Sequence, residues 1–170
     1  MPVFCPSTTT AMAIEIEHKF LLANSDWREQ TSHSCHYRQG YLSALPTTSI
    51  RIRMSGSQAW LNIKSAVIGT HRHEYEYEIP VQDADEMIAN LCQRPLIEKT
   101  RHFVNYQGYI WEIDEFEGDN KGLLVAEIEL SEVGEDFPKP PWLGQEVTDD
   151  LRYYNNNLIR YPYSQWRERP

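Results

Sequence analysis

The stretch IEIEHKFLL at residues 14–22 sets the pattern for the whole chain, because apolar and charged side chains alternate along it. In a β-strand, Glu15, Glu17 and Lys19 would share one face, and isoleucine and phenylalanine side chains would occupy the other. A strand with one apolar face usually turns its polar face to water. Here the polar face is unusual, because three charges crowd one side of a single strand.

The same period of two recurs along the chain and predicts a mainly β (α+β) protein. The expected strands cover residues 14–22, 34–43, 49–54, 58–65, 71–79, 97–106, 109–116 and 123–131. Their short connections favour antiparallel neighbours. One helix is expected between an N-cap at Asp83 and the dipeptide Arg94-Pro95, and a second, short one within residues 150–161.

The later strands also carry charges on one face, sorted strand by strand. These charges are Arg51 and Arg53, Lys64, Glu74, Glu76 and Glu78, Lys99 and Arg101, Glu112 and Asp114, and Glu127 and Glu129. For any single strand, a solvated sheet surface is the ordinary explanation. The whole set instead favours an eight-stranded antiparallel β-barrel with a charged, wet lumen, whose apolar outside is covered by a few flanking helices and the Pro-rich segment 137–142.

A charged lumen predicts its own ligand, because unpaired charges that leave water are costly. Opposing groups of carboxylates and of Lys/Arg side chains suit a polyanion that carries metal ions. Phosphate chains with Mg²⁺ or Mn²⁺ fit, since hard divalent cations choose carboxylate oxygens and Arg or Lys side chains bind phosphate oxygens.

The composition limits the other classes of function. The 170 residues carry 16 Lys and Arg against 25 Asp and Glu, a net charge of −9, which argues against a general nucleic-acid binder. No apolar run approaches the ~18 residues that a membrane span needs, and no secretory signal opens the chain. Three scattered cysteines favour free thiols and a cytoplasmic location.

The domain organisation follows from the same pattern. Residues 1–13 show no period and are expected to form a flexible tail, with Met12 as an alternative translation start. Residues 14–170 are expected to form a single domain.

The segment Glu15-Ile-Glu17-His-Lys19 resembles the ExExK signature of the CYTH family, the triphosphate tunnel metalloenzymes. Further similarities follow in order along the chain: Arg38-Gln39-Gly40-Tyr41-Leu42, Arg51-Ile-Arg53, Lys64, Arg72-His-Glu74-Tyr-Glu76, Glu98-Lys99-Thr-Arg101, Trp111-Glu112-Ile-Asp114 and Glu127-Ile-Glu129. The resemblance covers nearly everything from Ile14 to Pro162 and implies a tunnel that binds triphosphate-containing substrates with a divalent metal.

The resemblance also implies roles for individual residues. Metal ligands would be Glu15, Glu17, Glu127 and Glu129, with Asp114 and Glu112 as further or supporting carboxylates. A phosphate clamp would consist of Lys19, Arg51, Arg53, Lys64, Lys99 and Arg101, with Arg152 added from a closing segment. Some related triphosphatases use a Lys–Tyr pair as general base, which corresponds to Lys99 and Tyr41. In the alternative interpretation, Lys99 is one more clamp residue and Tyr41 packs in the barrel.

Three functions stay open at this point. The leading hypothesis is a metal-dependent triphosphatase acting on inorganic triphosphate, with a nucleotide or thiamine triphosphate as other substrates. The alternatives are an adenylate cyclase of the same fold and a noncatalytic polyphosphate-binding module. No nucleic-acid or membrane partner is expected, and a homodimer is a reasonable expectation for a small enzyme. The sequence does not decide between Mg²⁺ and Mn²⁺.

Overall fold

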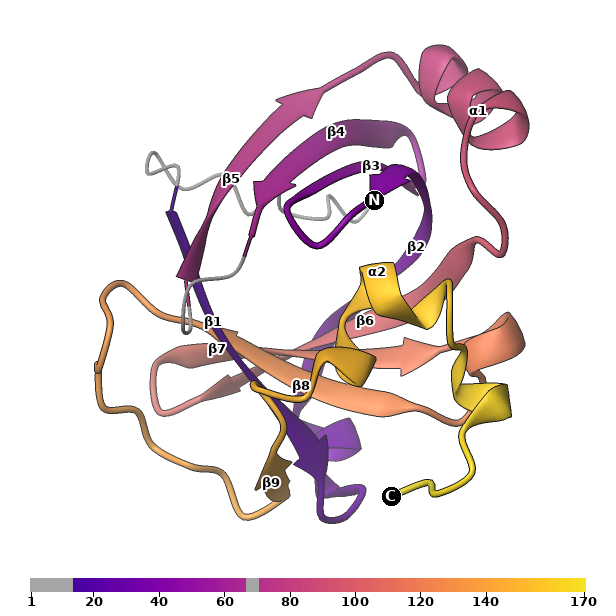
Figure 1. Ribbon diagram of the computed structural model, residues 1–170. Coiled ribbons are helices and arrows are strands. Elements are labelled where there is room, and N and C mark those ends of the chain that lie inside the picture. Colours follow the sequence, from indigo (N-terminus) through magenta and orange to yellow (C-terminus); the bar gives the residue numbers. More distant parts are fainter. Residues whose placement is uncertain (1–13, 67–70) are drawn as a thin grey trace.

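Nine antiparallel strands build the protein in the computed structural model, which describes residues 14–66 and 71–170 (Figure 1). The strands are β1 (Ile14–Leu22), β2 (Thr31–Ala44), β3 (Thr48–Ser55), β4 (Gln58–Ser65), β5 (His71–Glu78), β6 (Ile97–Tyr106), β7 (Tyr109–Phe116), β8 (Leu124–Glu129) and β9 (Leu143–Glu146). The expected tail of residues 1–13 lies outside the described residues.

Eight of the strands close into a barrel. They follow the order β5-β4-β3-β2-β6-β7-β8-β1, and a further pairing between β1 and β5 joins the two ends. This last contact is short, because only residues 14–16 of β1 pair with β5, whereas residues 17–20 pair with β8. The predicted eight-stranded antiparallel barrel is therefore confirmed.

The sequence pattern missed the ninth strand. Strand β9 pairs with β1 at Phe20 and Leu22, after the barrel has already closed through β5. Its four residues read LGQE and show no alternation of apolar and charged side chains. This strand can therefore be recognised from its pairing with β1 but not from its own sequence pattern. Strand β2 also begins three residues earlier than expected, at Thr31, with an irregularity between Thr31 and His33.

The helices lie outside the barrel. Helix α1 (Val81–Asn90) follows β5, and the short helix α2 (Asn155–Leu158) lies near the C-terminus. The remaining helical turns are η1 (Asp26–Gln30), η2 (Gly118–Asn120), η3 (Leu151–Tyr153) and η4 (Tyr163–Gln165). The predicted N-cap at Asp83 is wrong, because Pro80 occupies the cap position and Asp83 falls in the first turn. An acidic side chain is also favourable there, next to the free N–H groups of the helix.

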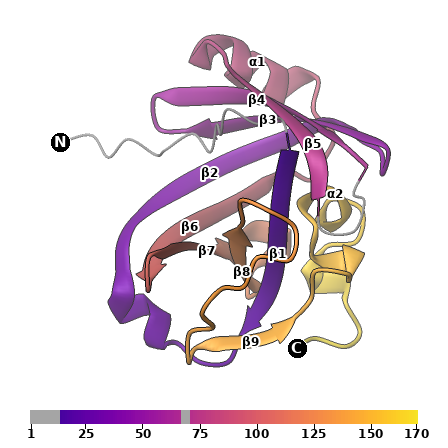
Figure 2. The same cartoon turned by 90° about the vertical axis from the view of Figure 1, so that its left-hand side faces the viewer.

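Three apolar clusters cover the outside of the barrel. Helix α1 packs Ala84 and Ile88 over β3 and β4 (Figure 2). The segment before β9 covers β1, β7 and β8, where the Trp142 ring lies 5.6 Å from that of Trp111. The C-terminal residues Leu158 to Trp166 cover the ends of β2, β6 and β7. The outer face of β5 is a counterexample, since Tyr75 and Tyr77 are 46% and 56% exposed.

The cysteines depart from the expectation of free thiols. Cys92 is free, but Cys35 is disulfide-bonded, so the prediction is wrong for Cys35. Three cysteines cannot all be paired within one chain, but their odd number leaves room for one disulfide bond, which the prediction of free thiols leaves out. Within residues 14–66 and 71–170, no helix is long and apolar enough to cross a membrane.

Candidate active site

The barrel encloses a cavity of about 470 Å³, counting the space open to solvent, and charged side chains line it. Six are acidic and six are basic, and Asn155 of α2 joins them. The lining residues are Glu15, Glu17, Lys19, Arg51, Arg53, Lys64, Arg72, Glu74, Arg101, Glu112, Glu127 and Glu129. The predicted charged lumen is therefore confirmed.

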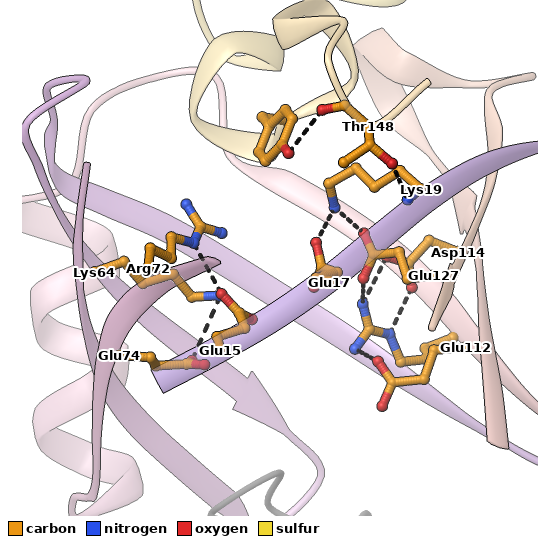
Figure 3. A network of polar contacts seen from close by, with 12 residues as sticks. Glu15, Glu17, Lys19, Lys64, Arg72, Glu74, Glu112, Asp114, Glu127 and Thr148 are labelled. Carbon is orange, nitrogen blue, oxygen red and sulfur yellow. Dashed lines mark hydrogen bonds and ion pairs between the residues drawn. The ribbon is translucent and has the colours of Figure 1, made fainter. Parts of the chain in front are cut away.

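Arg101 pairs with three carboxylates of the main ion-pair network, Glu112, Asp114 and Glu127. Figure 3 shows these three carboxylates close together. The Arg101 guanidinium donates to Asp114 at 2.7 and 2.8 Å, to Glu127 at 2.8 Å and also to Glu112. The Lys19 ammonium lies 2.5 Å from Glu17 and 2.6 Å from Glu127. Burial by itself would raise the pKa of Glu127, but the charges of Lys19 and Arg101 outweigh burial and lower it. Glu127 therefore stays ionised in the lumen.

A second network surrounds Glu15, near the place where β1 meets β5. The Lys64 ammonium donates to its carboxylate at 2.7 Å, and the Arg72 guanidinium donates at 2.8 Å (Figure 3). These two cations outweigh the effect of burial and hold the pKa of Glu15 well below its usual value. Glu15, like Glu127, therefore has two cationic partners and stays ionised.

Glu17 and Glu129 lack enough positive neighbours. Burial and the nearby Glu127 raise the pKa of Glu17, although Lys19 opposes them. Partial burial and the charges of Glu15, Glu112 and Glu17 raise the pKa of Glu129 to about 8. Glu129 has no ion-pair partner in the described part of the chain.

A divalent cation fits this group of carboxylates. It would supply the positive charge that the group lacks, and carboxylate oxygens are the ligands that Mg²⁺ and Mn²⁺ prefer. A separate outer group, formed by His36, Glu98 and Glu117, has its ligand atoms within 4.8 Å of one another but lies away from the lumen.

A second pocket adjoins this cavity, shares Lys19, Arg51, Lys64, Arg72 and Asn155 with it, and has no carboxylate among its lining residues; we call it the cationic end of the cavity. Lys19, Arg51, Lys64 and Arg72 supply four cations there, and the other lining residues are neutral: Tyr41, Ser49, Asn62, Tyr154, Asn155 and Asn156. Arg51 has no ion-pair partner within the described ranges, and its Nε atom is buried without a hydrogen-bond partner. Lys19, Lys64 and Arg72 also pair with carboxylates of the adjoining wall, so among the described residues of this end Arg51 is the cation that an anion could bind without breaking an ion pair.

No hydrogen bond joins Lys99 to Tyr41 among the described residues, and their pairing stays a prediction. The Lys99 ammonium is buried and donates to Asp114, and burial lowers its pKa to about 8 despite the charge of that partner. In the register of β2 and β6, Tyr37 lies opposite Lys99, so Tyr41 is four residues further along β2. Tyr41 instead lines the cationic end of the cavity and packs with the apolar cluster under the C-terminal segment.

Arg152 lies outside the lumen group. Its guanidinium donates to Asp150 at 2.6 Å, and its side chain is 47% exposed. It lies 4.9 Å from the centroid of the Trp166 ring. The structure therefore does not bring Arg152 to the residues expected to bind phosphate.

Three lining residues were absent from the sequence-based set. Arg72 and Glu74 lie in β5, and Asn155 lies in α2. Alternation along β5 had already placed Glu74 on the charged face without a role in binding, and Arg72, two residues earlier, shares that face. Asn155 gave no such signal, because its position depends on how the C-terminal segment packs on the barrel.

Comparisons with known proteins identify the family. The model of the CYTH domain family matches residues 13–163. The chain is 43% identical to an inorganic triphosphatase of Acetivibrio thermocellus, over 92% of this chain and 100% of the relative. It is 40% identical to an inorganic triphosphatase of Nitrosomonas europaea, over 85% of this chain and 95% of the relative.

A solved structure leads to the same family. The crystal structure of an inorganic triphosphatase superposes with a TM-score of 0.62 at 32% identity, covering 85% of this chain and 93% of the other. The fold, the lumen and both sets of relatives therefore agree, and the chain belongs to the CYTH domain family.

Proposed function

We propose that the protein is a divalent-metal-dependent triphosphatase that hydrolyses the terminal phosphoanhydride bond of inorganic triphosphate inside the barrel. One observation carries this proposal: inside the barrel, a carboxylate group short of positive charge adjoins a pocket that four cations line, and the two share Lys19, Arg51, Lys64 and Arg72. A metal–polyphosphate complex needs carboxylates to bind the metal and Lys or Arg side chains to bind the phosphate oxygens. The relatives named inorganic triphosphatase support the choice of substrate.

The carboxylates Glu17, Glu127 and Glu129 would hold the metal, with Glu15, Glu112 and Asp114 as further or supporting residues. Bound there, Mg²⁺ or Mn²⁺ would neutralise charge on the phosphate oxygens. The protein's own task is to position the chain of phosphates, because phosphoryl transfer needs orientation and charge stabilisation more than covalent chemistry. Lys19, Arg51, Lys64 and Arg72 would bind phosphate oxygens at the cationic end, and Arg53 and Arg101 would extend this clamp.

Lys99 is our candidate for the general base. A pKa of about 8 leaves part of its amine neutral near neutral pH, so it can accept a proton from the attacking water. Tyr41 is proposed as its partner in catalysis. Tyr41 lines the cationic end, four residues along β2 from Tyr37, which lies opposite Lys99. The alternative is that Lys99 only neutralises phosphate charge and Tyr41 only packs.

A product analysis tests the proposed reaction against its two rivals. The protein is incubated with Mg²⁺ or Mn²⁺ and with triphosphate, ATP, thiamine triphosphate or pyrophosphate, and the products are separated. Phosphate release from triphosphate supports the proposal. Cyclic AMP from ATP, with triphosphate left intact, would identify an adenylate cyclase. Tight binding of triphosphate without metal-dependent release would identify a binding module.

A matched pair of variants locates the reaction. Glu127→Gln removes a lumen carboxylate bound to Lys19 and Arg101, and should abolish most phosphate release. Glu117→Gln makes the same chemical change on the outer surface and should retain the activity. Equal activity in both variants would place the reaction outside the lumen.

Two further expectations stay proposals. A homodimer in solution is tested by light scattering coupled to gel filtration, where a mass near 20.0 kDa would contradict it. A cytoplasmic location is tested by fractionating cells that express the native gene.

A further inference from the structure

The cavity has two unlike ends, and the C-terminal segment forms one of them. Glu112 and Glu129 lie toward the carboxylate side, whereas the cationic end is lined by Tyr154, Asn155 and Asn156 from this segment. Helix α2 lies beside the barrel there (Figure 1), and its Leu158 belongs to the same apolar cluster as Tyr41 and Ala44 of β2. The wall at this end is therefore anchored to the barrel.

Tyr154 is held firmly in that wall. Its hydroxyl donates to the Thr148 carbonyl at 2.9 Å, and the Thr148 hydroxyl accepts from the backbone N–H of Lys19 at 3.0 Å. The centroid of the Tyr154 ring lies 4.8 Å from the Lys19 ammonium and 5.7 Å from the Arg72 guanidinium. The ring therefore packs against two of the four cations, and the residue Tyr154 is only 7% exposed.

Three buried polar atoms without hydrogen-bond partners belong to residues that line this end. Asn155 Oδ1, Asn62 Oδ1 and Arg51 Nε are buried and have no hydrogen-bond partner among the described residues. Buried polar groups in folded proteins are nearly always paired, so three orphans at one cationic end indicate a ligand with both acceptor and donor atoms. A terminal phosphate is such a ligand, because its oxygens accept hydrogen bonds and its protonated form also donates one.

We infer that the cationic end is a closed subsite for the terminal phosphate, and that Tyr154 and Asn155 limit the substrate to a short phosphate chain. This inference rests on the proposed triphosphatase function and deepens it. A chain with one more phosphate finds the Tyr154 ring and the Asn155 side chain in its path. The longer chain must then bind with its reacting bond shifted away from the carboxylate group, so hydrolysis slows. If the tunnel were open at this end, longer chains would thread through and react equally well.

The experiment measures kcat/KM with Mg²⁺ for triphosphate, tetraphosphate and long-chain polyphosphate. For the unaltered protein we expect the tetraphosphate value to be at least about tenfold below the triphosphate value. Tyr154→Ala and Asn155→Ala, separately and together, should raise the ratio of tetraphosphate to triphosphate activity by about tenfold. Tyr154→Phe is the matched control: it loses the hydrogen bond to Thr148 but keeps the ring, so the ratio should stay at that of the unaltered protein.

Several results would overturn the inference. Equal kcat/KM for the three substrates in the unaltered protein is one, and an unchanged ratio in a folded Asn155→Ala variant is another. Asn155→Ala serves where Tyr154→Ala does not fold, because the Asn155 oxygen makes no bond in the described part of the protein. Calorimetric titration with triphosphate and tetraphosphate tests the closed end without turnover. Weaker binding of tetraphosphate by a protein that hydrolyses neither would reject the triphosphatase and keep the closed subsite.

Discussion

Glu129 should destabilise the metal-free protein at alkaline pH, so that Glu129→Gln stabilises it there. Partial burial and the neighbouring Glu15, Glu112 and Glu17 raise the pKa of this carboxyl from 4.5 to about 8. A carboxyl whose pKa is higher in the folded than in the unfolded chain costs stability as the pH rises past the unfolded value. The cost therefore begins near pH 4.5 and is complete above about pH 8.

The size of this effect follows from the pKa shift and the exposure of the side chain. By linkage, the full shift would correspond to about 5 kcal/mol of lost stability. Glu129 lies at the exposed edge of the cavity, where water screens its neighbours, so we expect about 1–2 kcal/mol. In a chain of this size, that stabilisation raises Tm by roughly 2–8 °C.

The assay is thermal unfolding in EDTA at pH 4 and pH 9. Glu129→Gln should unfold at the same temperature as the unaltered protein at pH 4 and at a higher temperature at pH 9. Glu117→Gln, on the outer surface, is the control for a lost negative charge. In the presence of Mg²⁺ the order should reverse at pH 9, because the variant loses a proposed metal ligand and with it the stabilisation by binding. A lower Tm for Glu129→Gln in EDTA at pH 9 would refute the reasoning.

Three other substitutions probe the same lumen. Lys99→Ala should lower kcat by about 10²–10⁴-fold. It should also remove the rise of kcat with pH that a general base with a pKa of about 8 produces. A change in KM alone would contradict the role of Lys99 as the base. Asp114→Asn should lower the free energy of unfolding, measured in urea, by about 3–5 kcal/mol, because Lys99 and Arg101 would remain buried with one counter-charge fewer. A loss below about 1 kcal/mol would disprove this reasoning. Asn62→Asp should raise KM for triphosphate at least tenfold more than Asn62→Ala does, since it adds a negative charge to the wall that also carries Arg51, beside Glu74 and Glu76. Equal KM values would argue against an anion there.

Alternation of apolar and charged residues predicted the barrel because it is a local property of each strand. The period of two in IEIEHKFLL places Glu15, Glu17 and Lys19 on one face whatever their neighbours are. The same reasoning cannot find β9, whose four residues show no such alternation. Nor does it find the start of α1, where Pro80 with a φ of −58° replaces the expected Asp83 cap.

Pairing between charges could not be predicted, because it depends on register and closure. Arg51 and Arg53 have the same parity in one strand, yet Arg53 donates to Glu76 at 2.9 Å and Arg51 has no partner in the described ranges. Asn62 causes part of this difference: its amide donates to Glu74 at 3.1 Å and to Glu76 at 2.5 Å, and so holds both carboxylates on the β5 side. Only the pairing of β3, β4 and β5 brings these side chains together.

The net charge of −9 seemed to oppose a phosphate ligand, and the lumen explains why it does not. Six acids and six bases line the cavity, so the lumen is neutral and the acidic excess belongs to the rest of the protein. In this neutral state Lys19 and Arg101 are occupied by Glu17, Glu112 and Glu127. A divalent cation on these carboxylates would compete with both side chains and leave them available for phosphate oxygens. Metal and triphosphate should therefore bind with positive coupling, and linkage requires that triphosphate raise the affinity for metal by the same factor. Independent binding in paired calorimetric titrations would mean that the ion pairs of the lumen persist when the substrate enters.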